Sequence, residues 1–249
     1  GQVERLANVV HGKWKRWQDP GLPQSGRGVA EKRAVYAPDL LAEDALRFIR
    51  EQHARPFFLY FAMNVPHANN EALRKTGDGT AVPDHGIYKD KNWTKQNKGQ
   101  AAMISYLDQM VGQVVRRLEA HGLDENTIIF FTSDNGPHSE GGNNVGFFDA
   151  NGPVTGIKRA MYDGGIRVPM IARWPGKIPA GEVIETVCGS IDIFPTVLKA
   201  AGVPVPDDRI IDGKDMMPVL TAKAGSPHEA LFAMQGGNLM IVRSGKWKL

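Results

Sequence analysis

The sequence predicts an α/β fold in which a mostly parallel sheet is sandwiched by helices. Two observations support this prediction. Short, nearly all-apolar stretches alternate along the chain with longer stretches whose apolar residues recur at helical spacing. The chain has 249 residues, of which 42% are hydrophobic, so it is long enough to bury a substantial core. Strands that alternate with amphipathic helices are typical of a parallel sheet covered on both faces.

The first predicted elements alternate regularly between helix and strand. Residues 37–52 form a helix with one apolar face, and residues 55–67 form a nearly all-apolar strand. Residues 101–122 form a second amphipathic helix, which ends at a glycine, a common helix terminator. Residues 127–132 form the next strand, because they are all apolar, aromatic or β-branched.

A loop rich in glycine and asparagine comes next, and further elements follow it. They are an apolar segment at 167–175, a helix at 192–202 and a final apolar run at 239–249. Residues 1–30 are basic, glycine-rich and weakly periodic, which predicts a surface segment rather than a core element.

The composition excludes several functions. A formal net charge of +3 without a basic patch gives no support for a nucleic-acid partner. The single cysteine, Cys188, rules out an internal disulfide framework. No apolar run approaches the roughly 20 residues of a membrane span, and the first residues do not have the form of a signal peptide. We therefore expect a soluble chain with neither nucleic acid nor membrane as a partner.

Polar side chains stand at the ends of both predicted strands. His67 ends the first strand, and Asp134 and Asn135 follow the second. Ligands bind beyond the carboxyl ends of the strands in open parallel sheets, so we expect these residues to meet at one rim.

The Asp134-Asn135 pair has two interpretations. A carboxylate and an amide oxygen suit a hard cation, Ca²⁺ or Mg²⁺. The triplet Asp-Asn-Gly is also a common tight turn that needs no ligand. A calcium site takes about six to eight oxygens, so this pair alone does not complete one.

Three basic residues are candidates for contact with an anion. Lys158, between a glycine-containing loop and a Gly-Gly turn, could hold an oxyanion, although most lysines are solvated surface residues. His67 could bind an anion or donate a proton to a leaving group, and a structural histidine is as good an interpretation. His138 is similar and is tied to the Asp-Asn-Gly loop.

Several segments, taken in order, form a more specific pattern than any one of them. They are PFFLYFAMNVPH, AAMISYLDQMVGQVVRRLEAHGLDENTIIFFTSDNGPH, GIKRAMYDGGIRVPMIARWPGKI, DIFPTVLKAAG and VRSGKWKL. This order resembles the arylsulfatase family of the alkaline-phosphatase-like superfamily, from about Tyr36 to the last residue.

The resemblance implies a role for each candidate residue. Asp134 and Asn135 correspond to two of the family's Ca²⁺ ligands, and Lys158 corresponds to a lysine that contacts the sulfate. His67 corresponds to a histidine that contacts the sulfate or the leaving oxygen. His138 is a further candidate for substrate binding. The substrate implied is a sulfate ester, either an aryl or a carbohydrate sulfate.

The departures from the family pattern are as informative as the matches. The family's nucleophile is a formylglycine made in a Cys-x-Pro-x-Arg motif, which this sequence lacks, and Cys188 stands in a different context. The paired aspartates that complete the family's metal site are also missing. The run HGKWKR, from His11 to Arg16, resembles a further family motif but has Lys15 where that motif has histidine.

The simplest interpretation is an internal piece of a sulfatase. Residues 1–220 would be a partial, alkaline-phosphatase-like catalytic domain, and residues 221–249 the start of a small C-terminal antiparallel subdomain. We expect such a chain to be inactive alone, to bind Ca²⁺ weakly or not at all, and to self-associate through an open sheet edge. The parent enzyme would be periplasmic or secreted, as sulfatases commonly are.

Two other functions stay open at this point. A phosphatase or phosphodiesterase of the same superfamily usually needs a histidine-rich two-metal site, whereas Asn135 indicates a single hard cation. A non-catalytic module that binds sulfated glycans would use Lys158, His67 and the basic opening segment.

Overall fold

The computed structural model describes residues 9–11 and 29–249. The chain divides into two compact units. The first unit consists of residues 1–123 and 137–153, and the second consists of residues 124–136 and 154–249. The domain boundary predicted at residue 220 stays a prediction.

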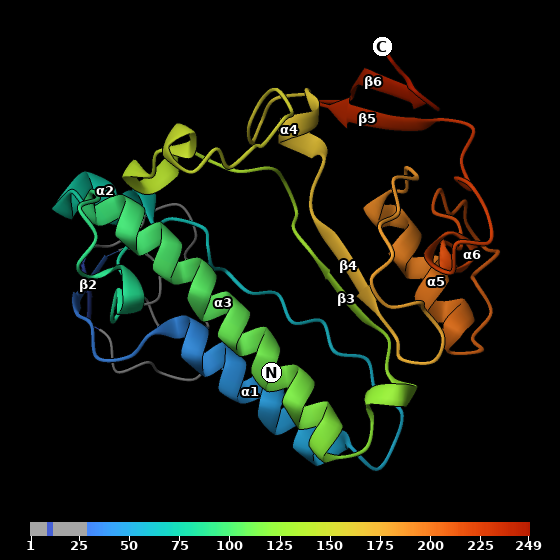
Figure 1. The fold of residues 1–249 in the computed structure, drawn as a ribbon, viewed down its shortest axis with the longest axis horizontal. Helices are drawn as coiled ribbons and strands as arrows, with labels where there is room; N and C mark the ends of the chain where they lie inside the picture. Colours follow the sequence, from blue (N-terminus) through green and yellow to red (C-terminus); the bar gives the residue numbers. More distant parts are fainter. Residues whose placement is uncertain (1–8, 12–28) are drawn as a thin grey trace. The chain divides into compact units, whose positions relative to one another are not determined.

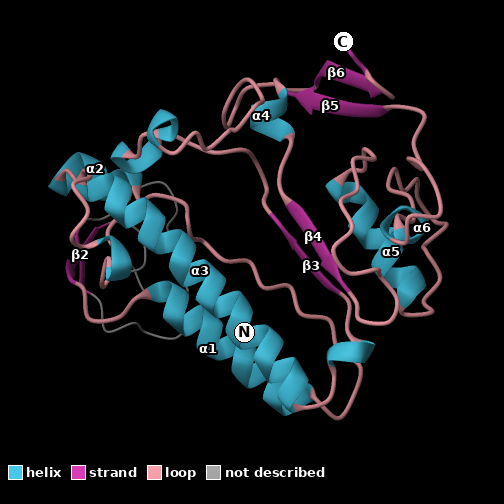
Figure 2. Ribbon diagram, viewed as in Figure 1, coloured by secondary structure: helices cyan, strands magenta, loops and turns pink. Residues whose placement is uncertain are grey.

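The first unit is mainly helical (Figures 1 and 2). Its elements are β1 (Val9–His11), β2 (Val29–Lys32), α1 (Ala37–Gln52), α2 (Asn70–Thr76), η1 (Gly86–Tyr88), α3 (Lys95–Ala120), η3 (Glu140–Gly142) and η4 (Val145–Phe147). The η elements are short 3-10 helices, and β1 pairs antiparallel with β2. The helix predicted at 37–52 is confirmed as α1.

Helices α1 and α3 lie side by side and form the core of this unit (Figure 1). The buried face of α1 contains Ala42 and Ala45, whose small side chains allow close approach, and α3 contributes Met103 and Met110. Helix α3 begins at Lys95, earlier than the predicted residue 101, because its first turn is polar and shows no apolar periodicity.

The strand predicted at 55–67 is not present. Residues 56–66 pair with no strand among the described residues, although the exposure of their side chains alternates as in a strand. Phe58 and Tyr60 are 70% and 82% exposed, and the residues between and beside them are half-buried. An apolar run specifies burial, but a strand also requires a neighbour that pairs with its backbone.

The second unit contains most of the strands. Its elements are η2 (Asp124–Asn126), β3 (Ile129–Thr132), α4 (Asp163–Ile166), β4 (Met170–Arg173), η5 (Ser190–Asp192), α5 (Ile193–Ala200), α6 (Met217–Leu220), β5 (Leu231–Gln235), β6 (Asn238–Ser244) and β7 (Trp247–Lys248). Strands β5, β6 and β7 form an antiparallel sheet in that order, as expected for the end of the chain.

The strand pairing corrects the expectation of a parallel sheet. Strand β3 pairs with β4 in antiparallel register, with Ile129 opposite Arg173 and Thr132 opposite Met170. Every strand pair among the described residues is antiparallel. Hydrophobicity identified the β3 and β4 segments as apolar, but it carries no information about strand direction.

A buried aspartate organises the helical part of the second unit. Asp192 is fully buried, and its carboxylate accepts hydrogen bonds from the backbone N–H of Gly189 at 2.8 Å and of Lys214 at 2.7 Å. His228 Nε2 lies 2.7 Å from the same carboxylate. A buried carboxylate needs such partners. At the start of α5, Asp192 therefore holds together the three segments that contain Gly189, Lys214 and His228.

No helix in the described part of the chain combines the length and the apolar character needed to cross a membrane.

Candidate active site

His67 lies in a turn of the first unit, directly after the unpaired apolar segment. Its backbone N–H donates to Asn64 O at 3.0 Å, and its Nδ1 lies 2.7 Å from Ala68 O. A carbonyl oxygen only accepts hydrogen bonds, so Nδ1 carries a proton. The imidazole is half exposed, as a group that meets a ligand must be.

His138 lies beside His67, with ring centroids 5.3 Å apart. It is buried, its Nε2 donates to Pro66 O at 3.3 Å, and its Nδ1 accepts from Glu140 N at 3.1 Å. Both of its nitrogens are therefore used within the protein. The structure brings the two histidines together, with His138 holding the turn of His67. A direct contact of His138 with substrate stays a prediction.

Glu140 is a member of this site that the sequence did not reveal. Its Oε2 lies 3.2 Å from His67 Nε2, and its side chain is only 11% exposed. The available signal was an acidic residue two places after His138, in the run Ser139-Glu140-Gly141-Gly142. An acidic residue in a glycine-rich loop usually faces solvent, and for this reason the sequence alone gave it no role.

Asp134 and Asn135 follow β3 in the second unit. Asp134 is exposed and Asn135 is half-buried. Asn135 Nδ2 donates to Gly136 O at 3.0 Å, a bond that leaves the amide oxygen available to a ligand.

Gly136 completes this turn for a packing reason. Its backbone N–H donates to Gly165 O at 2.9 Å, and a Cβ at position 136 would lie 1.8 Å from Gly164 O. The Asp-Asn-Gly turn therefore lies backbone to backbone against the Gly-Gly turn of α4.

Lys158 stands in the loop before that Gly-Gly turn and is half-buried. Gly164 N donates to Thr155 O at 2.8 Å, and a Cβ at Gly165 would lie 2.0 Å from Ala160 O. The same pair of glycines thus contacts the Lys158 loop on one side and the Asp-Asn-Gly turn on the other. Asp134 and Asn135 therefore lie on one loop of the second unit and Lys158 lies on another. We call these two the interlocked loops, because both contact the Gly164-Gly165 pair.

Asp163 anchors the interlocked loops to the C-terminal sheet. Its carboxylate lies 2.6 Å from Lys248 Nζ and 3.2 Å from Arg243 Nη1. The hydrogen bond from Lys248 is the main reason that the pKa of Asp163 lies below its usual value. Strands β6 and β7 thus help to fix the position of α4.

The donor set at residues 134 and 135 fits a hard cation in type but not in number. It provides one carboxylate and one amide oxygen, whereas calcium takes about six to eight oxygens. Within residues 9–11 and 29–249, no group of three or more histidine, cysteine, aspartate or glutamate side chains could hold a metal ion. The described residues therefore do not form a complete calcium site.

Cys188, predicted to be a buried filler, is half-buried in the structure. It is a free thiol, and burial, followed by the negative charge of Asp192, raises its pKa. A raised pKa lowers the fraction of thiolate, so Cys188 is a poor nucleophile. The motif run from His11 to Arg16 lies outside the described residues except for His11.

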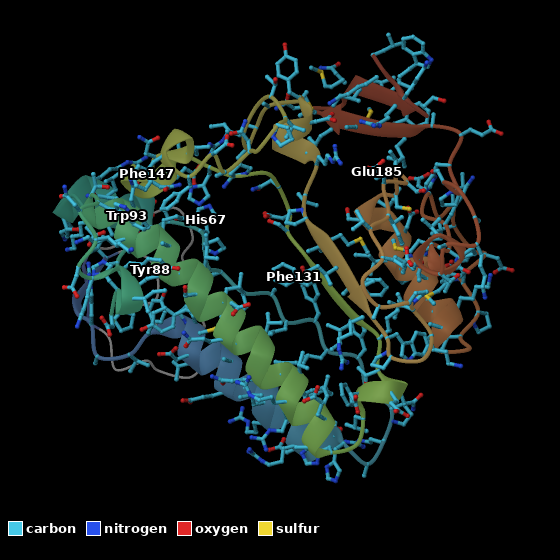
Figure 3. The ribbon with its side chains drawn as sticks, in the orientation of Figure 1. His67, Tyr88, Trp93, Phe131, Phe147 and Glu185 are labelled. Atoms are coloured by element: carbon cyan, nitrogen blue, oxygen red, sulfur yellow. The ribbon has the colours of Figure 1, made fainter. Side chains whose placement is uncertain are left out.

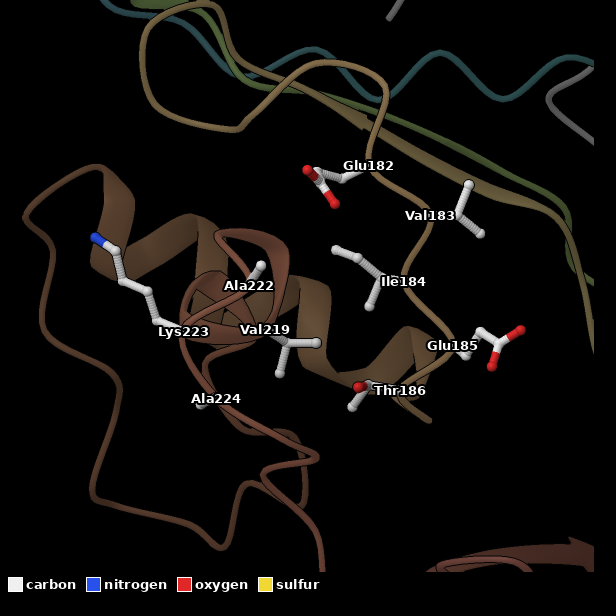
Figure 4. Close-up of a pocket in the computed structure, with 9 residues that line it drawn as sticks. All are labelled: Glu182, Val183, Ile184, Glu185, Thr186, Val219, Ala222, Lys223 and Ala224. Atoms are coloured by element: carbon white, nitrogen blue, oxygen red, sulfur yellow. The ribbon is translucent and has the colours of Figure 1, made fainter.

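Two hollows contain none of the predicted residues. The first hollow, of about 450 Å³, is in the second unit (Figure 4). It is lined by residues Glu182 to Thr186 and by Val219, Ala222, Lys223 and Ala224, at the end of α6 and just after it. Another of about 300 Å³ in the first unit is lined by η1 and α3 residues, including Tyr88 and Tyr106. Neither brings together a set of groups suited to catalysis.

Comparison with known proteins identifies the family. The sulfatase family model matches residues 11–203. The N-acetylgalactosamine-6-sulfatase of Mus musculus is 37% identical over 211 residues, which cover 84% of this chain and 37% of that protein. The steryl-sulfatase of Homo sapiens is 38% identical over 206 residues, which cover 82% of this chain and 33% of that protein. The chain belongs to the sulfatase family.

A solved structure agrees with this assignment. The crystal structure of Ps i-CgsB in complex with k-i-k-neocarrahexaose has a TM-score of 0.71 and 28% identity, and the match covers 92% of this chain and 51% of that one. Such neighbours confirm the predicted alkaline-phosphatase-like fold class, of which this chain holds a part. The chain spans about a third of the length of the curated relatives. Because the relatives are sulfatases, the phosphatase and binding-module alternatives are not favoured.

Proposed function

We propose that the protein to which this chain belongs hydrolyses sulfate esters. The observation that carries the proposal is the pair of interlocked loops in the second unit. One loop presents the hard-oxygen pair of Asp134 and Asn135, and the other presents Lys158. A cation and an ammonium group held on adjacent loops suit an anion with several oxygens.

Each candidate residue has a defined part in this proposal. In the second unit, the ammonium group of Lys158 would neutralise sulfate oxygens. In the first unit, His67 would bind a sulfate oxygen or donate a proton to a leaving oxygen. His138 holds the turn that carries His67. Asp134 and Asn135 would supply two oxygens toward Ca²⁺, which would add positive charge at the sulfate when bound. The described residues alone do not complete this cation site.

The nucleophile is not among the residues of this sequence. The chain has no Cys-x-Pro-x-Arg motif from which a formylglycine could be made. Its only cysteine, Cys188, has a pKa raised by burial. We therefore propose that this chain holds and polarises a sulfate group but does not attack it.

Sulfated carbohydrates are the substrate class that we propose. One relative is named for N-acetylgalactosamine 6-sulfate, and one structural neighbour was solved with a neocarrahexaose. These names describe those proteins, and they support the proposal by family relationship. Another relative is named as a steryl-sulfatase, so a steroid sulfate is the natural comparison ligand.

A binding experiment tests this proposal on the full chain. Calorimetry with a sulfated and a desulfated carrageenan oligosaccharide should give measurable affinity for the sulfated one only. Lys158→Ala should weaken that affinity at least about tenfold, because a charge-assisted contact is worth roughly 1.5–3 kcal/mol. Lys177→Ala, which removes an exposed lysine of the same unit, is the matched control. Equal binding of the two oligosaccharides would refute the proposal.

A further inference from the structure

We propose that the smaller hollow, in the first unit, is a binding site for an uncharged sugar ring. This inference goes beyond the proposed function and does not rest on it. The hollow of about 300 Å³ is lined by η1, by the two residues before it and by one face of α3. Small-molecule sites span roughly 300–1,000 Å³, so this volume suits a single ring with its substituents rather than a long ligand.

The helix side of the hollow is one stripe of α3. Ala102, Ser105, Tyr106 and Gln109 recur at spacings of three and four residues, so they lie on the same face of the helix. Ala102 is buried and its small side chain leaves space beside it, whereas the other three residues carry a hydroxyl or an amide group. This face of α3 therefore supplies hydrogen-bonding groups around a place that is not filled by a large side chain.

Two hydroxyl groups join the two sides of the hollow. Tyr88 Oη, from η1, lies 3.1 Å from Ser105 Oγ, from α3. Only one of the two O–H groups donates in this contact, so the other O–H has no partner among the described residues and can donate to a ligand. The same contact ties η1 to α3, and a site whose sides are already held together loses less entropy when a ligand binds.

Two further polar side chains of the hollow are available to a ligand. His85 is half-buried and Gln109 is exposed, and neither side chain forms a hydrogen bond with another residue in the described part of the chain. The carboxylate of Asp84 adds an acceptor, and its Oδ1 is fixed by a hydrogen bond from Gly86 N at 3.0 Å. A sugar hydroxyl both donates and accepts, so a mixed set of imidazole, amide, carboxylate and hydroxyl groups suits it.

The charges at the hollow favour a neutral ligand. Among the described residues no lysine or arginine lines it, and Asp84 is its one acidic residue. A sulfate or phosphate group would meet this carboxylate without an opposite charge to offset the repulsion. The hollow therefore differs in kind from the interlocked loops, where Lys158 supplies a positive charge.

An aromatic cluster continues from the hollow (Figure 3). The ring of Tyr88 stacks on Trp93 with centroids 5.7 Å apart, and Trp93 packs edge-on against Phe147 with centroids 5.3 Å apart. Phe147 is 46% exposed, so the cluster reaches the surface. A sugar ring has apolar C–H faces between its hydroxyl groups, and aromatic rings beside hydrogen-bonding groups match both features. The cluster also fixes Tyr88 at the edge of the hollow.

An NMR titration of the full chain tests this inference, because a single sugar should bind with about millimolar affinity, too weakly for calorimetry. The probes are methyl galactoside and methyl glucoside, two uncharged sugars that differ in one hydroxyl. We expect at least one of them to shift the backbone amide signals of Tyr88 and Ser105 and the side-chain amide signal of Gln109. Gln109→Ala should weaken this binding roughly fivefold, as the loss of one uncharged hydrogen bond does. Gln113→Ala, which removes an exposed glutamine of α3 that does not line the hollow, is the matched control.

Two comparison ligands test the chemical class. Galactose 6-sulfate should shift the same signals only at higher concentrations than the neutral sugars, because it brings a negative charge toward Asp84. Adenosine offers an aromatic base, and stronger binding of adenosine at these signals would overturn the inference. No shift with either neutral sugar, or equal affinity in Gln109→Ala and the unsubstituted chain, would also overturn it. These signals report on the hollow whether or not the chain binds a sulfate ester, so the result is independent of the proposed function.

Discussion

At the scale of single residues, the site combines groups that the sequence identified with groups that only packing explains. Asp134, Asn135 and His67 were predicted from residue type and position at the ends of apolar runs. Lys158 was predicted from its place between a glycine-containing loop and a Gly-Gly turn. Glu140 was not, because its contact with His67 depends on two segments more than 70 residues apart in the chain. Side-chain chemistry is readable from sequence, but burial of one acid against one histidine is a property of the folded chain.

Calcium binding should be weak in this chain. Asp134 and Asn135 provide two protein oxygens, and water would have to supply the remaining ligands, so we expect an affinity weaker than micromolar. Calorimetry with CaCl₂ on the full chain measures it, with Asp134→Ala as the variant and Asp207→Ala, an exposed acid of the same unit, as the control. A micromolar or tighter affinity that disappears in Asp134→Ala alone would contradict this expectation.

At the scale of elements, helices were predicted better than strands. The apolar face of α1 identified its full extent, and α5 (Ile193–Ala200) lies within the predicted 192–202. Helical periodicity is a local signal, which the sequence contains in full. Strand pairing is not local. The segment 56–66 has the alternating exposure of a strand but no partner among the described residues, and β3 and β4 pair antiparallel.

The link between α4 and the C-terminal sheet should depend on pH. The pKa of Asp163 is lowered in the folded chain, chiefly by the hydrogen bond from Lys248. Its stabilising contribution is therefore present above the ordinary aspartate pKa of 3.8, and it is lost as the pH falls through the lower folded value. Asp163→Asn should lower the free energy of unfolding by about 1 kcal/mol at neutral pH, because a partly exposed ion pair is weak. In acid the same substitution should lower it by less.

Urea unfolding at several pH values, from neutral to strongly acidic, measures this difference. Asp207→Asn removes an exposed acid of the same unit and is the matched control. If the stability lost in Asp163→Asn were the same at all pH values, the ion pairs with Lys248 and Arg243 would not be its cause.

At the scale of the whole molecule, the described residues leave apolar side chains uncovered. Phe58 and Tyr60 on the unpaired segment are 70% and 82% exposed, and Ile171 on β4 is 62% exposed. Unpaired extended backbone with apolar side chains is a template for association with another chain. Self-association of this chain is thus an expectation that follows from its surface.

Light scattering over a range of concentrations tests that expectation. The average mass should rise with concentration, and Phe58→Lys should reduce the rise because it places a charge on the unpaired segment. Ile210→Lys, at a 92% exposed position of the second unit, is the control and should have a smaller effect. A constant monomer mass at high concentration would count against association.

We propose that this chain carries sulfate-holding residues without a nucleophile. The most direct measurement is nitrophenol release from 4-nitrophenyl sulfate, with added Ca²⁺, on a sample whose intact mass has been verified. We expect the chain to bind the ester and to release no nitrophenol. Release that tracks the protein and is abolished by Lys158→Ala would contradict it, because a nucleophile would then be present among these residues.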